Sequence, residues 1–157
     1  MANHEWSLDE LMHKAEAYCA SAEHCYVEVS NKLQQWGASS DKIEKIIQHL
    51  KDQRYIDEMR YCRAYVHDKV RYQGWGRIKI KAALIAKHLP APLINQAIAE
   101  INQTEYFDTL QRVIATKKRA IKSSDLMARE KLIRFCIQRG FTYEEIEDLM
   151  WLCRLVD

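Results

Sequence analysis

The chain has 157 residues, of which 48% are hydrophobic and 29% are charged, enough apolar material for one compact domain or a short repeat array. Only four glycines and two prolines occur, which argues against a sheet with many tight turns and favours helices. No apolar run approaches the ~20 residues of a membrane span, and the first ten residues lack the basic start of a signal peptide. We therefore expect a cytoplasmic protein.

Apolar residues recur at spacings of three, four and seven, which places them on one stripe of each helix. Gly, Ser, Asp, Thr and Pro interrupt this pattern where helices end or begin. In chain order the pattern predicts helices at about 8–20, 22–36, 40–52, 55–72, 76–88, 92–102, 106–121, 124–139 and 143–154.

The apolar pattern also repeats along the chain. Leu33, Leu84 and Cys136 are equivalent anchors, 51 and 52 residues apart. Each anchor is followed by Gly or His at +4 and by apolar residues at +10, +13, +14 and +17. After Leu33 these residues are Gly37, Ile43, Ile46, Ile47 and Leu50. After Leu84 they are His88, Ile94, Ala97, Ile98 and Ile101, and after Cys136 they are Gly140, Ile146, Leu149, Met150 and Cys153.

A repeat of this length predicts three-helix units that are too small to bury their apolar faces alone and therefore stack on their neighbours. We expect an N-terminal tail at 1–7 and helical repeats at 8–53, 54–104 and 105–157, with the opening helix of the first repeat the weakest match. The predicted fold class is all-α, with three tandem three-helix repeats forming an elongated, curved helical array. Such an array presents surface to a partner rather than a deep pocket to a small molecule.

The sequence offers no pattern typical of catalysis or metal binding. Nucleotide-binding glycine loops, H-E-x-x-H and G-x-S-x-G are absent, and no C-x-x-C pair occurs among the five cysteines. The adjacent His24-Cys25 is better explained by packing and capping at a helix start. Carboxylates at 144–148 fall in the first turns of the last predicted helix, where the helix dipole favours them. We expect no catalytic residue, no cofactor, no metal and buried, unpaired cysteines.

The charges are distributed unevenly, although the net charge is only +2. Residues 1–58 carry a net charge of −5, residues 59–122 carry +9, and residues 123–157 carry −2. Lys and Arg are concentrated between Arg60 and Lys87, among several aromatic residues, and again between Arg112 and Lys122. The middle of the chain is thus a basic block between acidic ends.

Basic side chains beside aromatic rings suit a polyanion or an acidic protein groove. The alternative is a solvated helix face over core aromatics, and for the first cluster both interpretations stay open. For the second cluster we favour binding, because four cations within six residues repel one another without a partner. Trp75 lies between Gly74 and Gly76. Its ring could be exposed to bind a partner, or it could pack at the junction between two repeats, and we favour the second interpretation. The residues expected to contact a partner are Arg71, Trp75, Arg77, Lys79, Lys81, Lys117, Lys118 and Arg119.

The segment G-W-G-R-I-K-I-K-A-A-L resembles the RecX family, whose pattern is G-x-G followed by an apolar residue at +4 and Leu at +8, here Ile80 and Leu84. The segment 130–150 is similar to the family's closing segment, an apolar helix ending in R-G-[FY] before an acidic helix start. Residues 28–33 match E-L-x-x-K-L, and residues 54–57 stand where the family has G-Y-L-D. The resemblance covers residues 8–154 in register.

Three positions depart from the family pattern. Cys25 replaces a capping Ser, Ser30-Asn31 replaces a basic pair, and His88 replaces a Gly. The first and third changes affect expected helix ends. The second weakens the case for cationic contacts from the first repeat.

The resemblance implies a regulatory protein that binds the RecA nucleoprotein filament, lies in its helical groove across neighbouring subunits, and restrains ATP hydrolysis and strand exchange. It places the chain in DNA repair, recombination and the SOS response, with the single-stranded DNA inside the filament as a further candidate contact. Neither a membrane nor a small-molecule substrate is expected. The alternative is a helical-repeat protein that binds DNA directly, without RecA.

Overall fold

The computed structural model describes residues 4–156, except for the side chains of 153–156. Over this range the chain is all-helical, so the predicted fold class is confirmed. The first repeat consists of α1 (Leu8–Ser21), α2 (Tyr26–Gln35) and α3 (Ser40–Asp52); the second of α4 (Glu58–Arg71), α5 (Arg77–Ala86) and α6 (Ala91–Ala99); and the third of α7 (Gln103–Ala120), α8 (Ala128–Gln138) and α9 (Tyr143–Val156).

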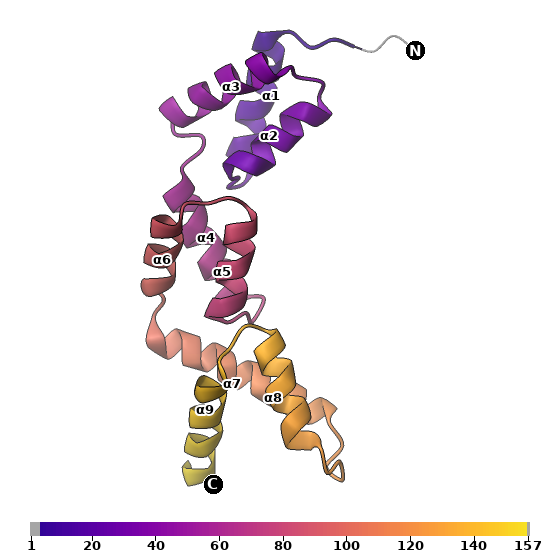
Figure 1. Cartoon of the computed structure of the whole chain (residues 1–157), viewed down its shortest axis with the longest axis vertical. Coiled ribbons are helices and arrows are strands. Elements are labelled where there is room, and N and C mark those ends of the chain that lie inside the picture. Colours follow the sequence, from indigo (N-terminus) through magenta and orange to yellow (C-terminus); the bar gives the residue numbers. More distant parts are fainter. Residues whose placement is uncertain (1–3, 157) are drawn as a thin grey trace.

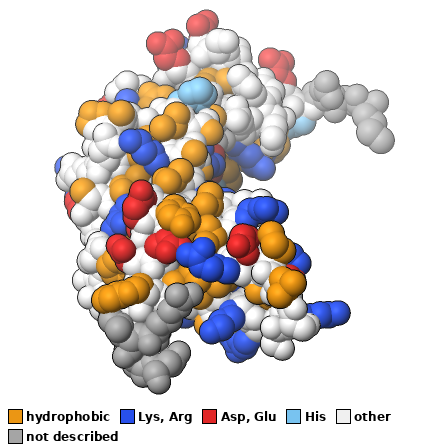
Figure 2. Space-filling view, turned by 60° about the horizontal axis from the view of Figure 1, so that its bottom comes forward, with side chains coloured by type: hydrophobic (Ala, Val, Ile, Leu, Met, Phe, Trp, Pro, Cys, Tyr) orange, Lys and Arg blue, Asp and Glu red, His pale blue; other side chains and the backbone are white. Residues whose placement is uncertain are grey.

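The three repeats follow one another along the long axis of the molecule, in an elongated and curved row (Figure 1). Figure 2 is turned so that the third repeat faces the reader. On this face, hydrophobic side chains lie among Lys, Arg, Asp and Glu side chains. Within the part of the chain that the structure describes, no helix is long and apolar enough to cross a membrane.

Side-chain caps determine where most helices begin. Ser7 and Glu10 form a capping box at α1, Ser39 accepts the Lys42 N–H at α3, and Asp57 accepts the Arg60 N–H at α4. Asn102 caps α7 in the same way. Each cap satisfies backbone donors that the first turn leaves free, which contributes about 1 kcal/mol.

Four predicted helix starts were wrong by about one turn, and local chemistry explains each difference. The helix expected from 22 begins at Tyr26, because Cys25 is extended and forms its N-cap. Those expected from 55 and 106 begin after the caps Asp57 and Asn102. The helix expected from 124 begins at Ala128, after a turn in which Asp125 accepts the Met127 N–H at 2.9 Å.

The three predicted anchors occupy equivalent environments. Leu33, Leu84 and Cys136 are fully buried. Each anchor carbonyl accepts a hydrogen bond from the backbone N–H five residues later, at 3.0, 3.3 and 3.2 Å respectively. The residue at +4 is left-handed each time: Gly37 at φ 84°, His88 at φ 60° and Gly140 at φ 100°. This backbone geometry is a Schellman-type helix end, so the repeat register is confirmed. The equivalent position at Cys153 lies outside the described side chains.

The core is divided unevenly among the repeats. The first repeat has a cluster of its own, to which Leu11, Leu33 and Ile46 contribute one residue from each helix. The second and third repeats share one continuous cluster, which extends from Tyr61 to Leu149 and also includes Cys25 of the first repeat. The last two repeats therefore share their core fully, as expected, whereas the first repeat shares less of it: Cys25 belongs to the larger cluster, and Ile56 of the second repeat belongs to the smaller one.

Candidate partner-binding surface

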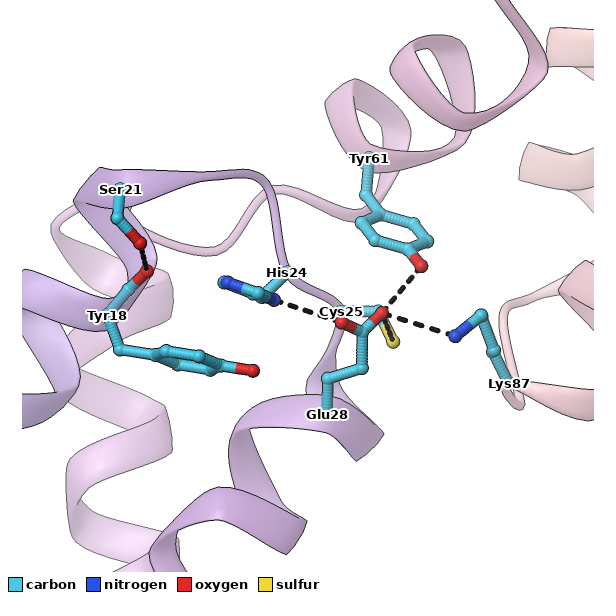
Figure 3. Close-up of polar contacts among 7 residues, drawn as sticks. All are labelled: Tyr18, Ser21, His24, Cys25, Glu28, Tyr61 and Lys87. Atoms are coloured by element: carbon cyan, nitrogen blue, oxygen red, sulfur yellow. Dashed lines mark hydrogen bonds and ion pairs between the residues drawn. The ribbon is translucent and has the colours of Figure 1, made fainter. Parts of the chain in front are cut away.

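The junction between the first and second repeats is centred on one carboxylate, Glu28 of α2 (Figure 3). Tyr61 of α4 donates its hydroxyl hydrogen to Glu28 Oε1 at 2.6 Å, and Lys87 Nζ lies 3.4 Å from the same oxygen. His24 Nδ1 lies 2.9 Å from Glu28 Oε2, and the Cys25 thiol donates to Oε1 at 3.3 Å. Groups from both repeats thus meet at a single side chain, next to Cys25, which belongs to the core cluster of the second and third repeats.

The ionisation of Glu28 follows from this environment. Burial opposes the charged form, but hydrogen bonds from His24, Tyr61 and Cys25, together with the charge of Lys87, outweigh burial and lower the Glu28 pKa to about 2. Burial and the bond to Glu28 raise the Tyr61 pKa, so this phenol remains a donor. Glu28 therefore carries a negative charge at neutral pH.

The cysteines have structural surroundings. Cys19, Cys25, Cys62 and Cys136 are free thiols and are buried. Burial raises the pKa of Cys19, Cys62 and Cys136 to about 11, which leaves little reactive thiolate. Cys25 stands at the N-cap of α2, where the resembled pattern has Ser, and makes no side-chain hydrogen bond to the backbone of the first turn. Among the described residues no group of three or more His, Cys, Asp or Glu is placed to hold a metal ion.

The junction between the second and third repeats is made by backbone contact. The Gly76 N–H donates to the Arg139 carbonyl at 2.7 Å, and the Ile78 N–H donates to the Gly140 carbonyl at 3.1 Å. A Cβ on Gly76 would lie 2.3 Å from the Gly140 oxygen, and one on Gly140 would lie 2.5 Å from the Lys79 nitrogen. Only glycine allows this approach.

Arg77, a predicted contact residue, is largely engaged inside this junction. Its guanidinium lies 3.9 Å above the buried Tyr106 ring, donates to Gln103 at 3.0 Å, and lies 3.5 Å from the Glu145 carboxylate. Its backbone N–H donates to the Tyr106 hydroxyl at 3.1 Å. The main role that the structure gives Arg77 is to hold α5 against α7 and α9.

Trp75 also closes this junction while keeping part of its ring exposed. It is half-buried and packs against the core shared by the second and third repeats. Lys69 Nζ and Lys79 Nζ lie 4.6 and 4.3 Å from its ring centroid. Cations at this distance interact favourably with the ring face. The inner side of the Trp75 ring therefore packs on the core, as predicted, and two Lys side chains lie beside the same ring.

A second ring beside the junction has the same arrangement. Phe135 of α8 is half-buried, with Lys117 Nζ at 4.8 Å and the Arg139 guanidinium at 5.3 Å from its centroid. Arg139 also donates to the Gln73 carbonyl, two residues before Trp75, at 3.2 Å. We call these side chains the cation–aromatic strip: Lys69, Trp75, Lys79, Arg139, Phe135 and Lys117.

The structure brings three of the predicted contact residues, Trp75, Lys79 and Lys117, into this strip. Lys81 is exposed and lines a shallow groove of about 320 Å³ between α5 and α6, together with Arg77. Arg71 is exposed at 3.9 Å from Glu105.

The remaining two predicted residues lie in the last turn of α7. Lys118 and Arg119 are both exposed there, and Arg119 donates to the Ala115 carbonyl at 3.3 Å. The predicted set therefore covers several faces rather than one patch.

Three members of the strip were absent from the predicted set. Lys69 belongs to the basic block, and its spacing of six residues from Trp75 could have suggested proximity across a tight turn. Phe135 and Arg139 stand four residues apart, the spacing at which side chains meet on a helix. The hydrogen bond from Arg139 to the Gln73 carbonyl spans 66 residues, so no local pattern could indicate it.

Comparison with known proteins identifies the family. A model described as the second three-helix domain of RecX matches residues 57–98, and a model of the third three-helix domain of RecX matches residues 104–150. Together they cover more than half of the chain. The chain belongs to the RecX family. Both matched RecX domains include residues of the cation–aromatic strip.

Curated relatives agree with the family models. A Regulatory protein RecX of Vibrio campbellii is 33% identical over 79% of each chain. A Regulatory protein RecX of Chlorobaculum tepidum is 31% identical over 85% of this chain and 81% of its own. RecX is thus a family of regulatory proteins rather than of enzymes.

The fold is also that of solved RecX structures. A crystal structure of RecX from Lactobacillus salivarius superposes with a TM-score of 0.80, covers 94% of this chain and 97% of its own, and is 19% identical. A crystal structure of a regulatory protein RecX gives a TM-score of 0.79 over 96% of this chain and 82% of its own, at 16% identity. Both structures share the helical-repeat fold.

Proposed function

We propose that this protein binds a RecA nucleoprotein filament in the cytoplasm and lowers its ATPase and strand-exchange activity. The observation that carries the proposal is the cation–aromatic strip, which spans the second and third repeats of an elongated array. Membership of the RecX family supports the regulatory role, and the family's name associates it with recombination.

The shape supports binding to a polymer. A row of nine helices in the described chain extends much further than a sphere of the same mass (Figure 1). Such a row can contact two neighbouring subunits of a filament at once. Simultaneous contacts raise the effective concentration of the second site and so strengthen binding without new chemistry.

The exposed Lys and Arg side chains support binding to an acidic surface of the filament. Trp75, Lys79 and Lys117 contact it through the strip, and the exposed Arg71, Lys81, Lys118 and Arg119 add positive charge on other faces of the array. Arg77 acts mainly by holding the junction that supports the strip. Exposed cations of this kind chiefly increase the association rate, and their effect falls as salt rises.

The direct test is the ATPase of RecA on single-stranded DNA, measured as this protein is added. Inhibition at fewer than one protein per RecA subunit is the expected result. Lys117→Glu, Lys118→Glu and Arg119→Glu together are expected to raise the concentration for half-inhibition about tenfold, or ~1.4 kcal/mol.

The matched control reverses three exposed cations at the end of the first repeat and the start of the second, with Lys45→Glu, Lys51→Glu and Arg54→Glu together. This control is expected to inhibit nearly as well as the unaltered chain. Equal inhibition by the α7 variant, with an unchanged thermal unfolding curve, would remove that end of α7 from the contact surface. No effect of the unaltered chain on the ATPase, with salt-sensitive binding to naked DNA, would favour direct DNA binding instead.

A further inference from the structure

An apolar groove lies at the end of the array, between α7, α8 and α9. Its volume is about 600 Å³. The apolar side chains that line it are Ile114, Ala115, Ile121, Ala128, Leu132, Leu149 and Met150. Leu132 and Leu149 are nearly buried, whereas Ala115 is exposed and Met150 is half-buried. The groove thus has an apolar floor that reaches the surface.

The rim of this groove is positively charged. Lys118, Lys122 and Arg129 line it, and none of its lining residues in the described part of the chain is a carboxylate. Arg129 is neutralised by an ion pair with Glu147. Among the described residues, no ion pair engages Lys118 or Lys122. Hydrophobic side chains bordered by Lys and Arg are visible on this end of the molecule (Figure 2).

The lining favours a protein segment over a nucleic acid. Sites for single-stranded nucleic acid combine cations with aromatic rings on which bases stack. The cation–aromatic strip has such rings, but none of the described residues that line this groove is aromatic. An aliphatic floor instead takes the Leu or Met side chains of a docked helix, at positions i, i+3, i+4 and i+7.

We propose that this groove binds an amphipathic helix of a partner protein, with aliphatic anchors on one face and Asp or Glu along its flanks. The anchors lie on the floor between Ile114 and Met150, and the carboxylates face Lys118 and Lys122. This inference shares Lys118 with the proposed function, but it requires neither RecA nor DNA, so each of the two can fail without the other.

The test uses a fluorescein-labelled synthetic helix of about 15 residues, or roughly four turns, with Leu on one face and Glu elsewhere. A second peptide carries Lys in place of Glu. Fluorescence anisotropy is expected to show binding of the Glu peptide, weaker at high salt, and at least tenfold weaker binding of the Lys peptide. Equal binding of both peptides would contradict the charge argument.

A matched pair of variants locates the site. Ala115→Glu places a carboxylate in the groove and is expected to weaken binding of the Glu peptide about tenfold. Thr116→Glu makes the same charge change at the next residue of α7, which is exposed but does not line the groove, and is expected to cost less than about twofold. Equal losses in the two variants would overturn the assignment.

A measurement on the unaltered chain tests the site even if a variant fails to fold. On addition of the Glu peptide, the methyl NMR signals of Ala115, Ala128 and Met150 are expected to shift, while those of Val29 in the first repeat do not. Displacement of the peptide by oligothymidylate would instead assign the groove to nucleic acid. Sedimentation showing a dimer that the peptide does not dissociate would assign it to a second copy of the chain.

Discussion

The two junctions of the array join similar three-helix repeats by different means. Between the first and second repeats the core divides into two clusters that share little, and the charge of Glu28 links the repeats through Tyr61 and Lys87. Between the second and third repeats the core is continuous, and two glycines allow the backbones to touch. The first junction therefore depends on ionisation and the second on steric fit, so different perturbations should weaken each.

The largest expected effect comes from adding a methyl group at the second junction. In Gly76→Ala the new Cβ would lie 2.3 Å from the Gly140 carbonyl oxygen, where backbone must move. We expect a loss of about 3 kcal/mol in the free energy of unfolding, measured by urea denaturation.

Gly37→Ala provides the matched control for that substitution. Nothing lies within 4 Å of its added Cβ, so only the positive φ of 84° is unfavourable. The expected loss is about 1 kcal/mol. Losses of equal size in the two variants would show that close backbone contact does not hold the second junction.

The next largest effect is expected at the first junction, from Glu28→Gln. The amide keeps the shape of the side chain but loses the charge that Tyr61, His24 and Lys87 recognise. We expect a loss of about 2 kcal/mol at pH 7. Glu44→Gln on the exposed face of α3 is the control, and its effect should be close to zero.

The pH dependence of stability separates this junction from the other. In the folded chain the Glu28 pKa is about 2, below its ordinary value of 4.5. The contribution of Glu28 is therefore complete above pH 4.5 and is lost as the pH falls toward 2. Glu28→Gln should unfold with a shallower acid dependence than the unaltered chain, and parallel acid-unfolding curves would contradict this account.

The smallest effect concerns the helix end of the second repeat. His88 adopts φ 60°, where its equivalents in the other repeats are Gly37 and Gly140. His88→Gly relieves the left-handed strain but makes the unfolded chain more flexible, so we expect a net gain of about 0.5 kcal/mol. A lower melting temperature for this variant would mean that the imidazole makes a stabilising contact.

The sequence was sufficient to predict the repeat, because apolar spacing directly reflects which face of each helix is buried. Leu33, Leu84 and Cys136 could be aligned without any tertiary information. The division of the core could not be predicted in this way. It depends on contacts such as Glu28 with Lys87, which are separated by 59 residues and involve polar groups that leave no periodic signal.

The candidate surface was predictable in composition but not in arrangement. The basic block identified Lys79 and Lys81 together, yet residues two apart on a helix point to different faces, and only Lys79 joins the strip. Arg77 was selected for its charge, whereas the junction uses that charge internally. Charge clustering in a sequence indicates that a surface exists, and the fold determines which cations remain available to a partner.

The most direct test of the central claim is a comparison of binding to RecA filaments on single-stranded DNA with binding to the same DNA alone. Labelled protein would be titrated against each, and fluorescence anisotropy recorded at two salt concentrations. We predict that the filament binds at least tenfold more tightly than naked DNA at both salt concentrations. Equal affinity for the two, with the same steep loss as salt rises, would contradict a regulator that recognises the filament.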